Sequence, residues 1–166
     1  LRDPITDDLV TVATAGIPEE DAYVLKGHRT PLKALEPLLS QEFRAERSYL
    51  IPHGHKVWAN IAPEHFYTPA QNASQKGWQP DDALLTPLLT QSDETIGLLS
   101  LDLPKTGMPP SDHDIEAVGD FASAATWAIE RVRAHRSLAE YNRRIEDFIT
   151  LTSEELAKTS DVNALG

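Results

Sequence analysis

Three histidines, His53, His55 and His65, fall in one irregular stretch of the chain, residues 53–80. A His-x-His spacing at the end of a strand could hold a transition metal, and a single imidazole could ligate a haem iron. The stretch contains no HExxH motif and no carboxylate at a fixed spacing from the histidine pair, so further ligands for a metal are missing. We therefore favour the interpretation that these are loop histidines, and we predict no metal site.

The same stretch and the strand before it are rich in aromatic side chains, which suit an organic ligand better than a metal. Pockets for small molecules are mostly apolar and carry a few placed polar groups. The residues that we expect to line such a pocket are Tyr49, Ile51, His53, Trp58, Phe66, Tyr67 and Trp78. A filled hydrophobic core without a ligand explains the same aromatic residues equally well, so we assign no cofactor.

Pairs of carboxylates occur at Asp81 and Asp82, and at Asp112 and Asp114. They fall at a turn and at a helix start, where carboxylates are usually solvated or cap the helix. No nucleophile elbow, P-loop or glycine-rich phosphate cradle accompanies them. Because no nucleophile, base and oxyanion site are assembled, we expect a protein that is not an enzyme.

Composition restricts the class of protein further. With 166 residues, the chain has the length of one ordinary domain and can bury a hydrophobic core. It has no cysteine, which excludes disulfides, thiolate catalysis and Cys-ligated zinc and suits a reducing cytoplasm. A formal net charge of −11 argues against binding of a phosphate backbone, and the apolar runs are too short to cross a bilayer. We expect a cytoplasmic module without direct nucleic-acid or membrane contact.

Hydrophobic periodicity and turn residues predict the elements that position these side chains. The pattern predicts strands over residues 9–15, 47–52, 83–89 and 95–101, a helix over 31–43, and loops over 53–80 and 104–110. The last two strands are joined by a polar turn and should form a hairpin. Pro87 has no backbone N–H to donate, so we expect it at a bulge or with the missing N–H facing away from the neighbouring strand.

A long helix is predicted from Ser111 onward, because Ser111 and Asp114 form the Ser-x-x-Asp pattern of a capping box. An apolar stripe with steps of three and four follows, and its phase breaks near His135 and Arg136. The stripe consists of Ile115, Val118, Phe121/Ala122, Ala125, Ile129 and Val132, and resumes with Leu138, Tyr141, Ile145 and Phe148. This pattern favours a parallel homodimer through the C-terminal helix, with an inserted stutter at the break.

Residues 81–130 carry the most specific pattern in the chain. A strand, a polar turn and the strand Thr95-Ile96-Gly97-Leu98-Leu99-Ser100-Leu101-Asp102 lead through a proline-rich loop to a helix with Phe121-Ala122-Ser123-Ala124-Ala125. This order resembles the C-terminal half of a GAF domain, and residues 9–18 resemble the second strand of that family. The resemblance covers most of residues 9–133. It implies an α+β fold, in which an antiparallel β-sheet is flanked by helices and a small-molecule pocket is present in some members only.

The chain departs from the family in two respects. The first helix and first strand of the family have no counterpart after Leu1, and the Asn-Lys-Phe-Asp-Glu signature of the members that bind cyclic nucleotides is not evident. The second departure lowers the expectation of a cyclic-nucleotide ligand. We expect a GAF-like sensory domain over residues 1–133 and, over residues 134–166, a helical linker to a further domain that is not in this chain.

The resemblance implies a sensory and regulatory function. Binding of a small molecule or a partner would be transmitted through the C-terminal helix to an output domain, as in a histidine kinase of a two-component system, a cyclic-dinucleotide enzyme or a transcription activator. The alternative is a ligand-free dimerisation or protein-interaction module.

Overall fold

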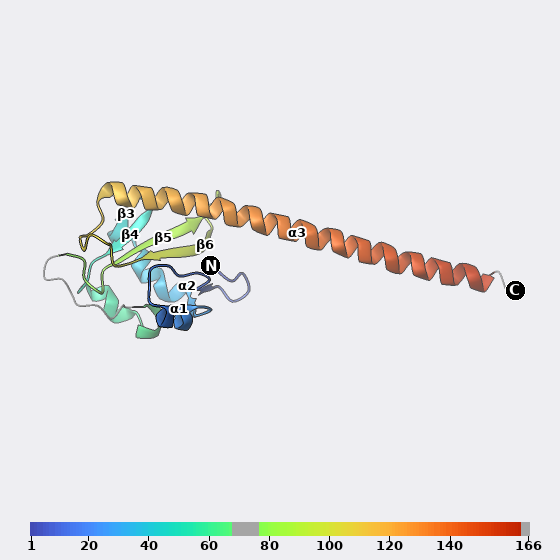
Figure 1. The fold of residues 1–166 in the computed structure, drawn as a ribbon, viewed down its shortest axis with the longest axis horizontal. Helices are drawn as coiled ribbons and strands as arrows, with labels where there is room; N and C mark the ends of the chain where they lie inside the picture. Colours follow the sequence, from blue (N-terminus) through green and yellow to red (C-terminus); the bar gives the residue numbers. More distant parts are fainter. Residues whose placement is uncertain (68–76, 164–166) are drawn as a thin grey trace. The chain divides into compact units, whose positions relative to one another are not determined.

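The computed structural model describes residues 1–67 and 77–163, and it describes side chains of the last helix as far as residue 152. The fold is α+β, with antiparallel strands, short helices and one long C-terminal helix (Figure 1). In chain order the elements are β1 Asp8–Val10, α1 Glu19–Leu25, β2 Arg29–Pro31, α2 Leu32–Leu35, η1 Glu36–Leu39, η2 Gln41–Phe43, β3 Arg44–Ala45, β4 Ser48–Ile51, η3 Lys56–Asn60, η4 Pro63–His65, β5 Ala83–Leu89, β6 Thr95–Leu101 and α3 Asp112–Asn163. Contacts divide the chain into two units, Leu1–Thr126 and Trp127–Gly166.

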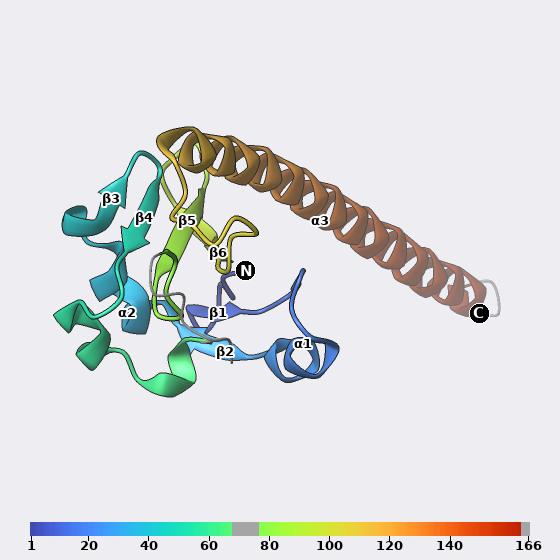
Figure 2. The ribbon, with the colours of Figure 1, turned by 60° about the vertical axis from the view of Figure 1, so that its left-hand side comes forward.

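The main sheet has four antiparallel strands in the order β3-β4-β5-β6 (Figure 2). Both strands of the β5–β6 hairpin have the predicted bounds, so this prediction is confirmed. Pro87 lies opposite Leu98 of β6, and the pairing of β5 with β4 ends at Leu85. The missing donor of Pro87 therefore interrupts no hydrogen bond between β4 and β5.

A second sheet pairs β1 with β2. Leu1 and Arg2 lie between this sheet and β6. The backbone N–H of Val10 donates to the carbonyl of Leu1 at 2.7 Å, and the N–H of Arg2 donates to the carbonyl of Ile96 at 2.9 Å. The first two residues thus connect the two sheets through backbone hydrogen bonds.

Two predicted elements are wrong in extent. The strand predicted over residues 9–15 ends at Val10, because the residues from Val12 onward are exposed and gain no buried face from pairing. The helix predicted over residues 31–43 is divided into α2 and the two 3-10 turns η1 and η2. Pro37 lies in the first turn of η1, where a proline is tolerated, but it has no N–H with which to continue α2.

The predicted loop over residues 53–80 contains the 3-10 turns η3 and η4, and its residues 68–76 lie outside the described part. Helix α1 was not predicted from the sequence. None of its side chains is buried, so it carries no apolar stripe by which a pattern could detect it.

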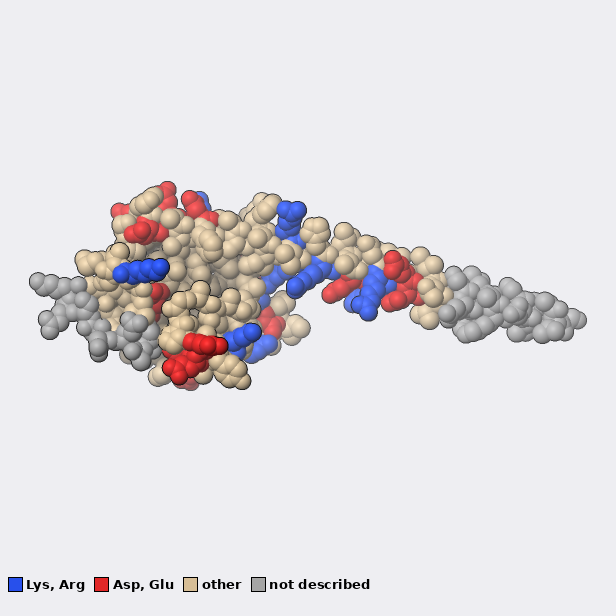
Figure 3. Space-filling model, viewed as in Figure 1, with Lys and Arg blue, Asp and Glu red and all other residues tan. Residues whose placement is uncertain are grey.

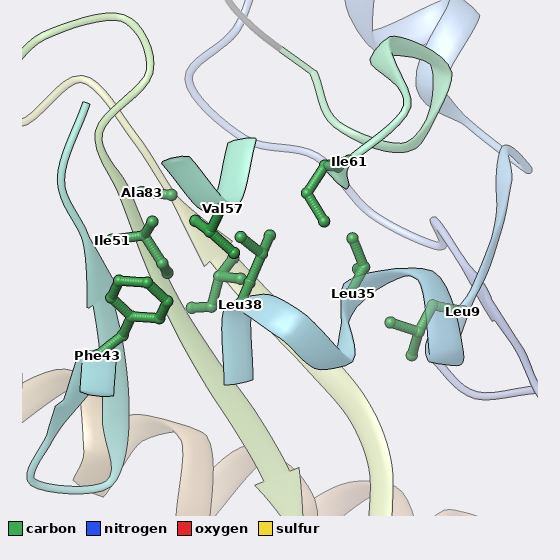
Figure 4. Packing of buried hydrophobic residues seen from close by; sticks show 9 residues of the cluster. Leu9, Leu35, Leu38, Phe43, Ile51, Val57, Ile61 and Ala83 are labelled. Atoms are coloured by element: carbon green, nitrogen blue, oxygen red, sulfur yellow. The ribbon is translucent and has the colours of Figure 1, made fainter. Parts of the chain in front are cut away.

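Hydrophobic clusters cover both faces of the main sheet. Neighbouring residues of β5 belong to different clusters, since side chains of a strand alternate between its faces. The first cluster, on the face covered by α2 and the 3-10 turns, consists of Leu9, Leu35, Leu38, Phe43, Ile51, Val57, Ile61, Ala83 and Leu85 (Figure 4). The second cluster has Trp78, Leu84 and Ile115 at its centre, and the first turns of α3 contribute to it.

Helix α3 begins with the predicted capping box. The backbone N–H of Ser111 donates to Asp114 Oδ2 at 2.9 Å, and the N–H of Asp114 donates to Ser111 Oγ at 3.3 Å. Ile115 and Ala122 of its first turns are buried. None of the helices in the described part of the chain has the length and apolar character that a membrane span requires.

Candidate functional site

Four of the predicted pocket residues lie together on the first cluster. Ile51 is fully buried in β4, and Tyr49, Trp58 and Phe66 pack against the cluster from its edge. The rings of Trp58 and Phe66 meet edge to face, with centroids 5.0 Å apart. Trp58 Nε1 donates to the carbonyl of Pro52 at 3.1 Å, so the polar atom of the indole already has a partner.

His53 is held by a buried carboxylate. The backbone N–H of His53 donates to Asp82 Oδ1 at 2.7 Å, and His53 Nδ1 lies 3.2 Å from the same oxygen. The N–H of Gln79 donates to Asp82 Oδ2 at 2.6 Å. Asp82 is buried, and backbone donors to both of its oxygens compensate for the loss of water. This arrangement fixes the residues after β4 to those before β5.

Tyr67 contacts Asp21 of α1. Its hydroxyl donates to Asp21 Oδ2 at 2.7 Å. This hydrogen bond to a carboxylate raises the pKa of Tyr67 to about 12, because loss of the proton would place two negative charges side by side. Tyr67 is therefore a hydrogen-bond donor at neutral pH.

Trp78 belongs to the second cluster and lies on the opposite face of the sheet from Trp58. Its Nε1 donates to Asp102 Oδ1 at 2.6 Å. Burial raises the pKa of the Asp102 carboxyl above its ordinary value, and hydrogen bonds from Trp78 and from the N–H of Leu103 oppose part of that shift. Trp78 therefore cannot share one pocket with Trp58 and Phe66.

The two remaining histidines of this region, His55 and His65, differ in their contacts. The ring of His55 meets Phe43 edge to face at 4.9 Å, and its Nδ1 accepts the N–H of Val57 at 3.2 Å. His65 Nδ1 is buried and has no hydrogen-bond partner among the described residues. Among the described side chains, no three His, Asp or Glu residues converge to hold a metal ion.

Two hollows lie on the surface of the first unit, and the predicted pocket residues line neither. One is lined by Val12, Ala13, Thr14 and Lys26. The other is lined by Glu46, Arg47, Ile115, Glu116, Gly119 and Asp120. The aromatic group on the first cluster, formed by Tyr49, Trp58 and Phe66, therefore lies outside both of these hollows.

The second unit carries a long apolar stripe on α3. Helix α3 is continuous through His135 and Arg136, where the apolar stripe predicted from the sequence changes phase. A single series with alternating steps of four and three runs along it: Trp127, Arg131, Ala134, Leu138, Tyr141, Ile145 and Phe148. At about 100° per residue, these positions fall in a sector about 100° wide, the geometry of a coiled-coil seam. We call these seven residues the seam.

The apolar side chains of the seam are exposed. The exposed fractions are 63% for Trp127, 59% for Leu138, 62% for Tyr141, 40% for Ile145 and 69% for Phe148. Of the charged residues in the same segment, Arg131 belongs to the seam and Glu130 lies at its edge, while the others lie outside this sector. Figure 3 shows both basic and acidic side chains along α3. The sequence interpretation missed Trp127 and Ala134, although their spacing from Leu138 was a usable signal.

Comparisons of the chain with protein-family models, with curated proteins and with solved structures gave no match.

Proposed function

We propose that this chain is a non-catalytic, GAF-type regulatory module of a cytoplasmic signalling protein, and that it acts as a homodimer whose paired α3 helices transmit a signal to an output domain. The observation that carries the proposal is the exposed seam. A helix exposed on all sides has no reason to place large apolar side chains at alternating steps of four and three over three heptads, whereas a coiled coil requires it.

The order of elements from β5 to α3 supports the GAF-type assignment. The segment that resembles the family forms a β-hairpin, a proline-rich loop and a helix with a capped start. In the helical motif, Ala122 is buried and Phe121 is exposed. This ending, from strand through proline-rich loop to helix, also fits a GAF domain better than a PAS domain.

Contacts between the sheet and the first turns of α3 suit a movable element. Arg47, next to β4, donates to Ser123 Oγ at 3.1 Å and lies 3.5 Å from the carboxylate of Asp120. Both charged groups of this ion pair are mostly exposed, so it adds little stability. Gly119 is buried beneath the aliphatic part of Arg47, and a Cβ at this position would lie 3.4 Å from Arg47 Cβ. A ligand or partner that moves Arg47 would therefore change how α3 packs, at low cost.

The second candidate function is a ligand-free dimerisation or interaction module. It is favoured by the aromatic group on the first cluster, since Trp58 and Phe66 pack against each other and line neither of the two hollows described above. In that case the exposed edge of the group is a docking surface for a protein.

Native mass spectrometry of the chain purified from its expression host tests the proposal. A dimer with extra mass supports the sensor and gives the mass of the ligand. A dimer without extra mass favours the interaction module. A monomer at tens of micromolar would contradict both, because each requires the seam to be paired.

A further inference from the structure

Arg131 is the one charged residue of the seam, and its position is the feature that a plain apolar seam does not explain. Its guanidinium carbon lies 5.6 Å from the centroid of the Trp127 ring, one helical turn away. This distance permits a cation–π interaction, and it holds the charge over the seam and away from the outer face of the helix. In a pair of identical helices, two Arg131 side chains would meet and repel unless an acidic group lies beside them.

Glu130 is the acidic group that the sequence supplies. It immediately precedes Arg131, it is half-buried, and it forms no ion pair within the described part of the chain. In the heptad repeat of the seam, Arg131 and Leu138 take the first position, and Trp127 and Ala134 take the fourth. Glu130 then takes the last position of the heptad that ends just before Arg131. Residues at this position flank the seam and select the partner and its orientation.

We propose that two copies of this chain pair along the seam in parallel and in register, and that Arg131 of each copy forms an ion pair with Glu130 of the other. The inference rests on the proposed function and adds the residues that set orientation and register. In a parallel, in-register pair, the side chain at a first position packs beside the last-position residue of the preceding heptad on the other helix. The dimer would therefore contain two equivalent ion pairs, each between Arg131 of one copy and Glu130 of the other.

The occupant of the seam is a second copy for two reasons. Each of the three seam aromatics exposes on the order of 100 Å² of apolar surface, so the seam is a strip of a few hundred Å², the size of the exposed apolar patches that often serve as interaction surfaces. The seam together with its flanking residue Glu130 is also self-complementary in charge, because Glu130 and Arg131 supply both signs at adjacent positions. A two-fold arrangement of identical helices satisfies both charges without another protein.

Disulfide trapping tests the orientation, and the absence of native cysteine makes it specific. We would compare Ala134→Cys with Thr152→Cys, which lies on the same sector about 27 Å further along the helix. Arg136→Cys, on the outer face, is the control. Parallel, in-register pairing predicts efficient dimer formation by the first two variants and little by the third, since a disulfide needs Cα atoms within about 7 Å. Antiparallel pairing can bring at most one of these two positions together, so trapping of only one overturns the proposal.

Charge reversal tests the ion pair. Arg131→Glu and Glu130→Arg each place like charges side by side twice in the dimer, and each should weaken dimerisation about tenfold or more. The double variant Glu130→Arg/Arg131→Glu should recover most of the affinity, and Arg136→Glu on the outer face should change it little. Sedimentation equilibrium gives the dissociation constants. If the wild type is a dimer and the reversals leave its affinity unchanged, this inference fails while the proposed dimer stands. If the wild type is a monomer, the proposed function itself fails.

Discussion

The side-chain oxygens of Ser48 and Thr86 lie 2.7 Å apart between β4 and β5, and both residues are fully buried. Each hydroxyl has lost its contact with water and is satisfied by the other. Removing one partner leaves the other unsatisfied, whereas replacing both by apolar groups of similar shape removes the requirement.

We therefore predict that Ser48→Ala lowers the free energy of unfolding by about 1–3 kcal/mol. The double variant Ser48→Ala/Thr86→Val should lie closer to the wild type than Ser48→Ala does. Urea unfolding of the four proteins of this cycle gives the coupling energy. Purely additive losses would show that the two hydroxyls do not form the bond.

The start of α3 depends on Ser111. Replacing Ser111 with Ala removes the acceptor for the N–H of Asp114, and the loss of such a cap costs about 1 kcal/mol. Thermal unfolding should show a lower Tm for Ser111→Ala, and Ser111→Asp, which keeps an acceptor at this position, should recover most of the loss. A Ser111→Ala variant with the wild-type Tm would mean that the cap does not stabilise the helix.

The same cap predicts a pH dependence. Hydrogen bonds from the side chain and backbone of Ser111 hold the pKa of Asp114 below its ordinary value. A carboxylate with a lowered pKa in the folded state stabilises the fold above its unfolded pKa, and this contribution is lost as the pH falls through the folded value. Asp114→Asn should therefore destabilise the protein at pH 7 and have a smaller effect in acid, which chemical unfolding at both pH values would measure.

Asp102 should behave in the opposite sense. Burial raises the pKa of Asp102, so the folded state binds this proton more tightly than the unfolded state does. The contribution of Asp102 to the free energy of unfolding therefore falls as the pH rises from the ordinary carboxyl pKa through the raised value. Asp102→Asn keeps an acceptor for Trp78 Nε1 and removes the buried charge. We expect the difference in free energy of unfolding between Asp102→Asn and the wild type to favour the variant more at pH 7 than at pH 4. The exposed Asp81→Asn is the control, and equal effects of the two substitutions would contradict burial as the cause.

Sequence patterns predicted the β5–β6 hairpin and the start of α3 because each depends on local chemistry. A polar turn between two apolar runs specifies the hairpin, and a Ser-x-x-Asp pair before an apolar stripe specifies the cap. Helix α1 and the interruption at Pro37 were not predicted correctly. The first buries no side chain, and the second depends on how strongly one proline competes with a helical stripe of leucines.

The candidate pocket shows the limit of sequence reasoning more clearly. Tyr49, Ile51, Trp58 and Phe66 share one cluster, but Trp78 lies on the other face of the sheet. Nothing in the spacing of the aromatic residues reveals this, since a long irregular segment separates them and only the fold determines which face each segment covers. The seam was recognised from Leu138 onward, but its extension to Trp127 was hidden by the overlapping stripe of Ile129 and Val132.

The central claim is that the seam pairs two copies of the chain, and light scattering of matched variants tests it most directly. We predict that the wild type has twice the 18.4 kDa mass of the chain. Leu138→Asp, within the seam, should give a monomer. Val132→Asp, at another exposed apolar residue that lies outside the sector, should remain a dimer. A monomeric wild type, or a Leu138→Asp variant that stays dimeric, would contradict the account.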